Sequence, residues 1–321
     1  MIVTDSLKHL TEDTNTHRVV VACGVFDGVH LGHQQIIQSL LSLSKKTNSK
    51  AVVMTFSPHP RKVVTGKTPP LLTCREHQLR IFKDMGIDAV IIIPFNKEIA
   101  ALSADDFLDL ELLVDNIELK GICVGSNWRF GARGEGTVQH LKKWGKAHNF
   151  HVISVPELDI DNEEVSSTRI RAAIQKGDLK TAEKLFGKPF SVFGEIKHGR
   201  GIGNDQLHCP TANLVIPNVL LPPPGVYAGH VTLKENEFQD VKQNKNDAIL
   251  YVGTAPSFNN AHEKPILECH IFNFDHDIYG MPVEVHFTAF IRKDKKFDST
   301  EKLAEQIQKD INTAKNILKT E

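Results

Sequence analysis

Short apolar runs alternate with helix-like segments through the first half of the chain. The segment after the first run places Ile36, Ile37, Leu40 and Leu41 on one helical face. Strands that alternate with helices indicate a parallel sheet covered on both faces, and hence an α/β domain. Such sheets bind ligands at the carboxyl ends of their strands. The predicted strands span residues 18–23, 50–56, 88–95, 121–125 and 150–155.

The pattern changes after Pro189, where glycine and proline become frequent and the strand-like runs lie close together. Closely spaced strands with turn residues between them predict a small antiparallel β-barrel. A helix with one apolar stripe is predicted over 298–318. Gly187 and Pro189 end a helical stretch, so we expect two domains, 1–187 and 188–321. The predicted barrel strands span residues 191–196, 225–233, 248–253, 266–272 and 282–291.

Charge and composition exclude several classes of partner. Lys plus Arg number 38 against 39 for Asp plus Glu, which gives a formal net charge of -1. Nucleic acid and anionic membranes are therefore not expected as partners, and the 7% aromatic content offers no stacking surface. No run approaches the ~20 apolar residues of a membrane span, and the N-terminal residues do not resemble a signal peptide.

The cysteines indicate the compartment. There are five of them and none forms a CxxC pair, so we expect reduced thiols in a soluble, cytoplasmic protein. The sequence leaves homo-oligomerisation open.

The stretch GVFDGVHLGH (24–33) lies where the first strand passes into the first helix. Backbone N–H groups at a helix N-terminus bind phosphate, and His30 and His33 would add side-chain donors beside it. Gly32 would allow a phosphate to approach without a Cβ in the way. Spacing alone leaves other interpretations open: an ordinary turn at Asp27 and Gly28, structural histidines, or a metal pair. No HExxH pattern or adjacent acidic ligand supports the metal pair.

The chain resembles a known family in several motifs at once. The 24–33 stretch resembles the HxGH motif of the nucleotidylyltransferase superfamily, whose domain is Rossmann-like. Three later motifs are similar to the adenylyltransferase half of bacterial bifunctional FAD synthetase: FSPHP (56–60), VGSNWRFG (124–131) and VSSTRIR (165–171). Others are similar to its riboflavin kinase half, which implies a riboflavin kinase type of barrel: CPTANL (209–214), PPPGVYAG (222–229), LECHIFNFDHDIYG (267–280) and FIRKDKKFDSTEKL (290–303).

The resemblance implies roles in the first half. His30 and His33 would bind ATP phosphates and stabilise the transition state of adenylyl transfer, with Asn127 near the reacting groups. A flavin pocket would be shaped by Phe56, Pro58 and His59. Considered separately, the FSPHP segment also fits a proline turn, and the serines and threonine of VSSTRIR also fit a plain helix cap. The implied nucleotide-binding residues are Gly24, Phe26, Asp27, Gly28, Gly32, Ser167, Thr168 and Arg171.

In the second half the resemblance assigns Thr211 and Asn213 to Mg²⁺ and ATP phosphate, and Glu268 to the catalytic base. Hydroxyl and amide oxygens two residues apart in extended chain point to one side and suit Mg²⁺. A turn at Thr211 and Asn213 and a solvated strand face at Glu268 are the alternatives. The ATP-covering loop would be glycine-rich and include Gly199, Arg200 and Gly201.

The implied function is bifunctional. Riboflavin and ATP would give FMN, and FMN with a second ATP would give FAD and pyrophosphate, both with Mg²⁺ or another divalent cation. The chain departs from the family at His208, Cys209 and Ala255, all near the kinase site. An alternative is therefore an FMN adenylyltransferase with a weakened or non-catalytic, flavin-binding C-terminal domain. A nucleotidylyltransferase acting on another metabolite fits the HxGH motif alone.

Overall fold

The computed structural model divides the chain into two compact units. The first comprises Met1–Pro69 and Gln78–Ser167, and the second comprises Pro70–His77 and Thr168–Glu321. A short segment from the first half of the sequence therefore packs with the second unit. The structure describes residues 1–13, 17–197, 212–216, 218–233, 245–255, 264–274, 276 and 278–319.

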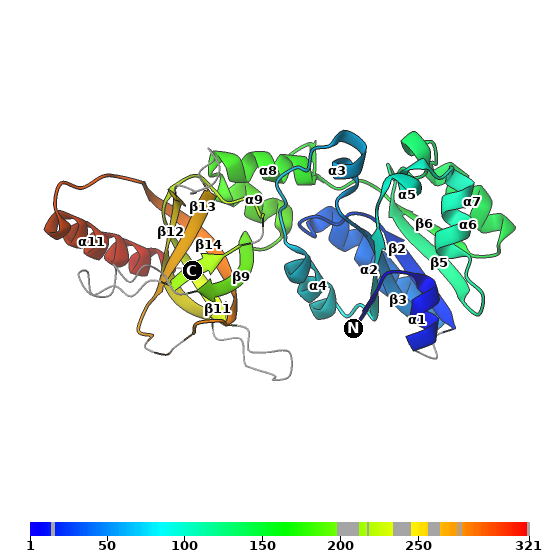
Figure 1. Cartoon of the computed structure of the whole chain (residues 1–321), viewed down its shortest axis with the longest axis horizontal. Helices are drawn as coiled ribbons and strands as arrows, with labels where there is room; N and C mark the ends of the chain where they lie inside the picture. The colour runs from blue at the N-terminus through cyan, green and yellow to red at the C-terminus, as the bar shows by residue number, and fades with distance from the viewer. Residues whose placement is uncertain are drawn as a thin grey trace. The chain divides into compact units, whose positions relative to one another are not determined.

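The first unit contains a six-stranded parallel sheet with the order β1-β4-β3-β2-β5-β6 (Figure 1). The central strand β2 pairs with β3 and β5, and its residues 19–23 are at most 1% exposed. The predicted parallel sheet is confirmed. Its edge strand β1 was not predicted, because three residues show no periodicity. The strands are β1 (Ile2–Thr4), β2 (Arg18–Cys23), β3 (Lys50–Ser57), β4 (Ala89–Pro94), β5 (Glu118–Gly125) and β6 (His151–Val155).

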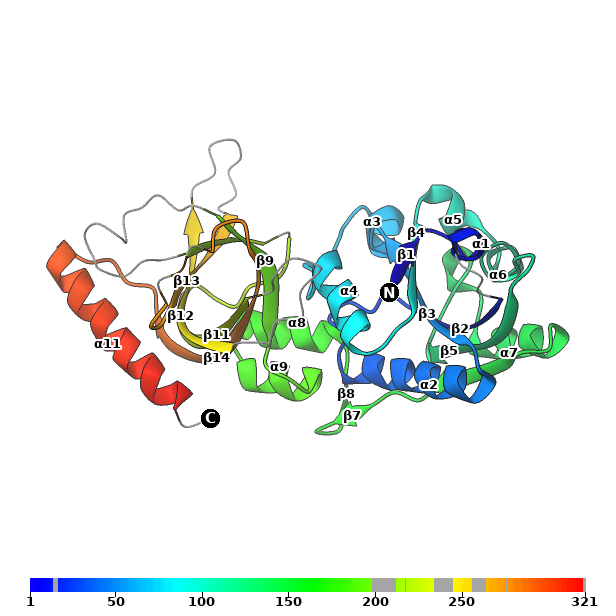
Figure 2. The same cartoon turned by 90° about the horizontal axis from the view of Figure 1, so that it is seen from below.

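Alternate residues of β2 face opposite apolar clusters. Val19 and Val21 pack with α1, α6 and α7, whereas Val20 and Ala22 pack with α2 and α4 (Figure 2). This period of two is the signature of a sheet buried on both faces. The helices of this part of the chain are α1 (Leu7–Asp13), α2 (Leu31–Thr47), α3 (Pro60–Thr65), α4 (Arg75–Asp84), α5 (Lys97–Ala101), α6 (Ala104–Leu112), the 3₁₀ turn η1 (Ala132–Gly134) and α7 (Val138–Ala147).

A small hairpin and two helices follow the sheet. The hairpin pairs β7 (Asp159–Ile160) with β8 (Glu163–Glu164), and both residues between them have positive φ, as a tight hairpin turn requires. Helix α8 (Ser167–Lys176) ends at Gly177 and α9 (Leu179–Phe186) ends at Gly187, both glycines in the left-handed region.

The second unit contains a closed antiparallel barrel with the order β10-β13-β12-β11-β14-β9. The terminal helix α11 (Thr300–Leu318) packs its predicted stripe, including Ile311, Ala314 and Leu318, against Ala228 and Phe272. The predicted barrel and terminal helix are confirmed. The strands are β9 (Ser191–Lys197), β10 (Ala212–Val215), β11 (Gly225–Leu233), β12 (Lys245–Ala255), β13 (Lys264–Ile271) and β14 (Pro282–Lys293).

A buried polar cluster holds the 70–77 segment in the second unit. Glu284 Oε1 lies 3.1 Å from His77 Nε2 and accepts a hydrogen bond from Ser191 Oγ at 2.8 Å. Burial raises the pKa of Glu284, but the hydrogen bond with His77 and the nearby positive charges outweigh it and hold the pKa well below its usual range. Burial lowers the pKa of the neighbouring His286 to about 4.

The His286 shift predicts acid sensitivity of the barrel. A group whose pKa is lower in the folded state stabilises the fold above its unfolded pKa, and this stability is lost as the pH falls through the folded value. With an unfolded pKa of 6.5 and a folded value of about 4, His286 should cost about 2 kcal/mol of unfolding free energy between pH 7 and 5. His286→Asn should lose most of this slope.

Urea unfolding at each pH, followed by the tyrosine band in second-derivative absorbance, measures this slope. All three tyrosines (Tyr227, Tyr251 and Tyr279) lie in the second unit, so the band reports on that unit. Equal slopes in wild type and His286→Asn would contradict the prediction.

Candidate functional site

The turn between β2 and α2 has an unusual backbone. Phe26 has φ 53°, Gly28 has φ 87° and Val29 has φ 42°. A β-branched residue such as Val29 rarely adopts positive φ, which costs about 1–2 kcal/mol. Backbone strain of this kind concentrates at functional sites. The turn lies at the carboxyl end of the central strand, where the sequence predicts ligand binding.

Side chains from other elements hold this turn by its carbonyl oxygens. Thr55 Oγ1 donates to Val25 O at 3.1 Å, and Ser167 Oγ donates to Asp27 O at 2.9 Å. Gln34 Nε2 donates to Val29 O at 2.9 Å. Hydrogen bonds of about 1 kcal/mol each offset the backbone strain. The sequence gives no signal for Thr55, because its partner lies 30 residues away.

His30 and His33 stack face to face at the start of α2. Their ring centroids lie 3.6 Å apart with an interplanar angle of 19°. His30 is the N-cap residue of α2, and its Nδ1 accepts a hydrogen bond from the His33 backbone N–H at 3.4 Å. His30 is buried, with 6% of its surface exposed. The pair is therefore positioned by the helix start itself.

His33 is held neutral, and one of its ring nitrogens has no hydrogen-bond partner. Burial, followed by the charge of His30, lowers the pKa of His33 well below its ordinary value of 6.5. Within the described part of the chain, nothing bonds to the buried Nδ1 atom. An unsatisfied buried polar atom costs about 1–3 kcal/mol. The arrangement therefore fits a ligand that supplies the missing partner.

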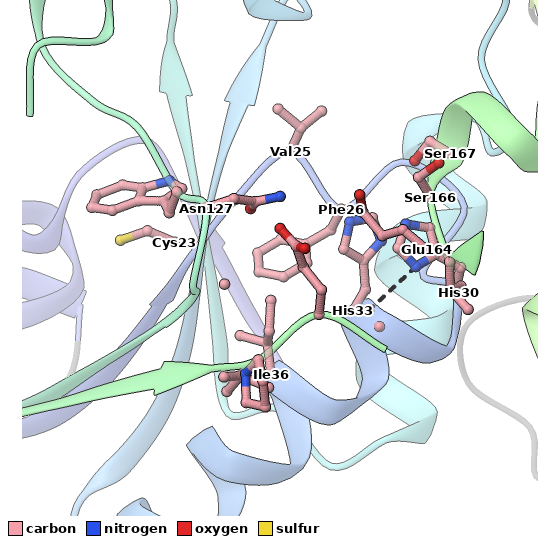
Figure 3. A pocket seen from close by; sticks show the side chains of 18 residues that line it. Cys23, Val25, Phe26, His30, His33, Ile36, Asn127, Glu164, Ser166 and Ser167 are labelled. Atoms are coloured by element: carbon pink, nitrogen blue, oxygen red, sulfur yellow. Dashed lines mark hydrogen bonds between the residues drawn. The ribbon is translucent and has the colours of Figure 1, made fainter. Parts of the chain in front are cut away.

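A cavity of about 290 Å³ lies beside the histidine pair. Figure 3 shows Asn127, Phe26, Glu164 and the two histidines around it. The α2 and α8 N-termini contribute to its polar side, and the apolar wall comes from the ends of β2, β5 and β6. The lining residues are Cys23, Gly24, Val25, Phe26, His30, Gly32, His33, Ile36, Gly125, Asn127, Trp128, Val155, Pro156, Glu157, Glu164, Val165, Ser166 and Ser167.

The structure brings many of the predicted site residues together. Seven of them line this one cavity: Gly24, Phe26, His30, Gly32, His33, Asn127 and Ser167. Of the remaining nucleotide-binding residues in this half, Asp27 is buried in the same turn, beside Gly28. Thr168 and Arg171 are grouped with the second unit, where Arg171 Nε donates to Pro70 O at 2.7 Å.

The three predicted flavin-binding residues do not line the cavity. Phe56 is 8% exposed and packs against Phe95 and Phe107. Pro58 follows a cis peptide bond, and His59 is the N-cap of α3, where its ring accepts from the Arg61 N–H at 3.1 Å. Their predicted role in flavin binding stays a prediction.

Two acidic residues that the sequence did not single out also line the cavity. Glu157 precedes the β7–β8 hairpin, and Glu164 ends it, three residues before Ser167 opens α8. Burial, followed by the charges of Glu157 and Asp159, raises the pKa of Glu164. Carboxylates repel phosphate but accept hydrogen bonds from hydroxyl and amino groups. In the sequence, only the adjacent VSSTRIR motif (165–171) indicates that these two glutamates lie near a site.

A second candidate site lies on the barrel, where β10 pairs with β13. Asn213 lies directly opposite Glu268, so both side chains project from the same face. Tyr251 of β12 lies opposite Glu268 on its other side. Burial, then the charge of Asp294, raises the pKa of Tyr251, whose hydroxyl donates to Asp294 Oδ2 at 3.2 Å.

The remaining predicted kinase-site residues fall outside the described residues. These are Thr211, the loop residues Gly199, Arg200 and Gly201, and the unusual positions His208 and Cys209. Ala255 ends β12, opposite Lys264 of β13.

The fold and the two sites define a two-domain enzyme of nucleotide chemistry. The family model for FAD synthetase matches residues 12–169, and the model for riboflavin kinase matches residues 186–318. The chain belongs to the family of bifunctional riboflavin kinase/FMN adenylyltransferases.

Similar proteins cover nearly the whole chain. Curated enzymes of this name from Buchnera aphidicola (subsp. Schizaphis graminum) and Escherichia coli K12 are 35% and 33% identical. Both matches cover 92% of this chain, and they cover 92% of the Buchnera aphidicola enzyme and 91% of the Escherichia coli enzyme. A crystal structure described as a macrolide-efflux protein from Streptococcus pneumoniae has a TM-score of 0.81 at 30% identity, covering 98% of this chain and 99% of that one. In the described part of the chain, the helices are too short or too polar to cross a membrane.

Gly32→Ala should separate folding from chemistry. A Cβ at Gly32 would lie 3.4 Å from His30 ring atoms and 3.6 Å from Val165 O, which are ordinary contacts. Stability should therefore hold, because Ala also favours the helix. The methyl group would occupy cavity space beside the His30 ring, so FAD formation from FMN should fall at least about tenfold. Steady-state kinetics with a thermal unfolding control measures this, and unchanged FAD formation would contradict the prediction.

Proposed function

We propose which residues of this chain carry the two reactions of its family. The chain is a bifunctional enzyme that phosphorylates riboflavin to FMN with ATP and adenylylates FMN to FAD. We assign adenylyl transfer to the cavity at His30 and His33, and riboflavin phosphorylation to the barrel face at Asn213 and Glu268. The observation that carries the first assignment is the buried, unpartnered Nδ1 of His33 at a helix N-terminus.

The histidine pair would bind the phosphates of ATP. Negative charge develops on the attacked phosphate in adenylyl transfer, and donors placed in advance stabilise it without reorganisation. His33, His30 and the positive end of α2 converge on one side of the cavity. Ser167 and Thr168 open α8 and offer a second helix start for phosphate, with Arg171 one turn further. Asn127 lies across the cavity as a polar group near the reacting atoms.

Glu268 would act as the base of the kinase reaction. A carboxylate that accepts the proton of the ribityl 5′-hydroxyl makes that oxygen a nucleophile for the γ-phosphate. Its cross-strand partner Asn213 presents an amide oxygen on the same face, which is a suitable ligand for Mg²⁺. When bound, Mg²⁺ neutralises phosphate charge in phosphoryl transfer. In the proposal Thr211 shares the metal with Asn213, and the glycine-rich 199–201 loop binds ATP.

We further propose the boundary between the catalytic domains at 187/188 and a cytoplasmic location. The boundary follows the end of α9 at Gly187, close to residue 186, where the match to the riboflavin kinase model begins. The cytoplasm suits the four described cysteines, all free and buried: Cys23, Cys74, Cys123 and Cys269. The alternative of a non-catalytic barrel is disfavoured because the riboflavin kinase model matches residues 186–318 and the bifunctional relatives cover 92% of the chain.

Single substitutions should separate the two reactions. With riboflavin, ATP and Mg²⁺, the wild-type chain should form FMN and then FAD. His30→Ala should stop at FMN, whereas Glu268→Gln should form no FMN from riboflavin yet still convert supplied FMN to FAD. Each loss should be about 10²- to 10⁴-fold. Chromatography of the flavins measures both products.

The controls are internal, because each variant retains the other reaction. If the wild-type chain formed neither FMN nor FAD, the proposed function would be wrong. If His30→Ala still converted FMN to FAD at the wild-type rate, the assignment of the first site would be wrong.

A further inference from the structure

Helix α4 reaches the histidine site through Gln78. The Gln78 side chain is buried, with 5% of the residue exposed. Its Nε2 donates to two successive carbonyl oxygens of the turn, Val25 O at 3.0 Å and Phe26 O at 2.9 Å. One amide group therefore fixes the orientation of two consecutive peptide planes, and all three residues lie within the first unit.

Each of the two carbonyl oxygens also accepts a second hydrogen bond. Val25 O also accepts from Thr55 Oγ1 at 3.1 Å. Phe26 O also accepts from the Val29 backbone N–H at 3.1 Å, a bond that belongs to the turn itself. Gln78 is thus the donor that ties Phe26, with its positive φ of 53°, to a neighbouring element. Its loss would leave both carbonyls bonded, so the fold should persist.

Phe26 in turn sets the position of His33. The Phe26 ring is 1% exposed and meets the His33 ring edge-on, with centroids 5.3 Å apart. On its other side Phe26 packs edge-on against Phe82, at 5.9 Å. Gln78 and Phe82 are four residues apart on α4 and share a face. The helix therefore holds Phe26 by its backbone and by its ring.

His33 also contacts the second histidine of the site, His30. The two histidine rings stack at 3.6 Å, so a displacement of Phe26 would move both imidazoles. Phosphate chemistry depends steeply on such placement, and a shift of about 1 Å costs up to about 10²-fold in rate.

We propose that Gln78 is a positioning residue for adenylyl transfer: it orients the His33 imidazole through Phe26 without touching the substrate. The inference rests on the proposed role of His30 and His33. It assigns to α4 a function in the N-terminal reaction beyond packing. The glutamine amide is needed because only an N–H donor can satisfy two carbonyl oxygens, whereas a carboxylate at the same place would repel them.

Two substitutions and a matched control test this. Gln78→Glu keeps the shape and removes the donor, and Gln78→Lys restores N–H donors on a flexible stem. Gln38→Glu makes the same chemical change on an exposed part of α2. We expect Gln78→Glu to lower kcat for FAD formation about 10- to 100-fold with little change in the KM values. Gln78→Lys should recover most of kcat, and Gln38→Glu and riboflavin kinase activity should be unchanged.

A double-mutant cycle then separates positioning from folding. In a His33→Ala background, measured by single turnover at high enzyme concentration, Gln78→Glu should have no further effect. An equal fall in both backgrounds, a change confined to KM, or wild-type kcat in Gln78→Glu would overturn the proposal. Full activity of His33→Ala would instead refute the proposed function of the site. The two failures are therefore distinguishable.

Discussion

The hydrogen bonds to the carbonyl oxygens of residues 25–29 are the interaction on which the proposed adenylyltransferase site depends. The donors come from four elements: Thr55 from β3, Gln78 from α4, Gln34 from α2 and Ser167 from the start of α8. Together they hold a turn in which two non-glycine residues have positive φ. The turn cannot take this form alone, because the strain would be unopposed. The site therefore forms only when the first unit is assembled, and the turn then sets the position of the histidine pair.

Strand register plays the same part in the barrel. Leu214 and Leu267 pair next to Asn213 and Glu268, and both leucines are buried. A slip of one residue would turn Glu268 inward and expose the leucines, so the apolar interior selects the register that presents the proposed base and Asn213 on one face. The polar cluster around Glu284 has a different role: it secures the 70–77 segment against the barrel strands.

Periodicity in the sequence predicts most of the fold. The five longer parallel strands, the end of the helical stretch at Gly187 and the stripe of α11 follow from local patterns of apolar residues and glycines. The same reasoning misses β1 and the β7–β8 hairpin, because elements of two or three residues carry no period. It also predicts 1–187 as one domain, whereas His77 and Gln78 are grouped with different units.

The candidate site shows the same limit. The cavity gathers His30, His33 and Asn127 as the motifs imply, yet Thr55, Gln78 and Glu164 join them only through long-range contacts. No local pattern marks a glutamine on a helix as a donor to a turn 52 residues earlier.

The most direct test of the central claim is a proton NMR titration of the two imidazoles, assigned with His30→Ala and His33→Ala. Without ligand, His33 should titrate well below its ordinary value of 6.5, because burial and His30 disfavour its charged form. Saturating pyrophosphate should raise the pKa of His33, since an adjacent negative charge stabilises the imidazolium. If His33 titrated at its ordinary value and pyrophosphate left both rings unchanged, the turn would not be the phosphate site.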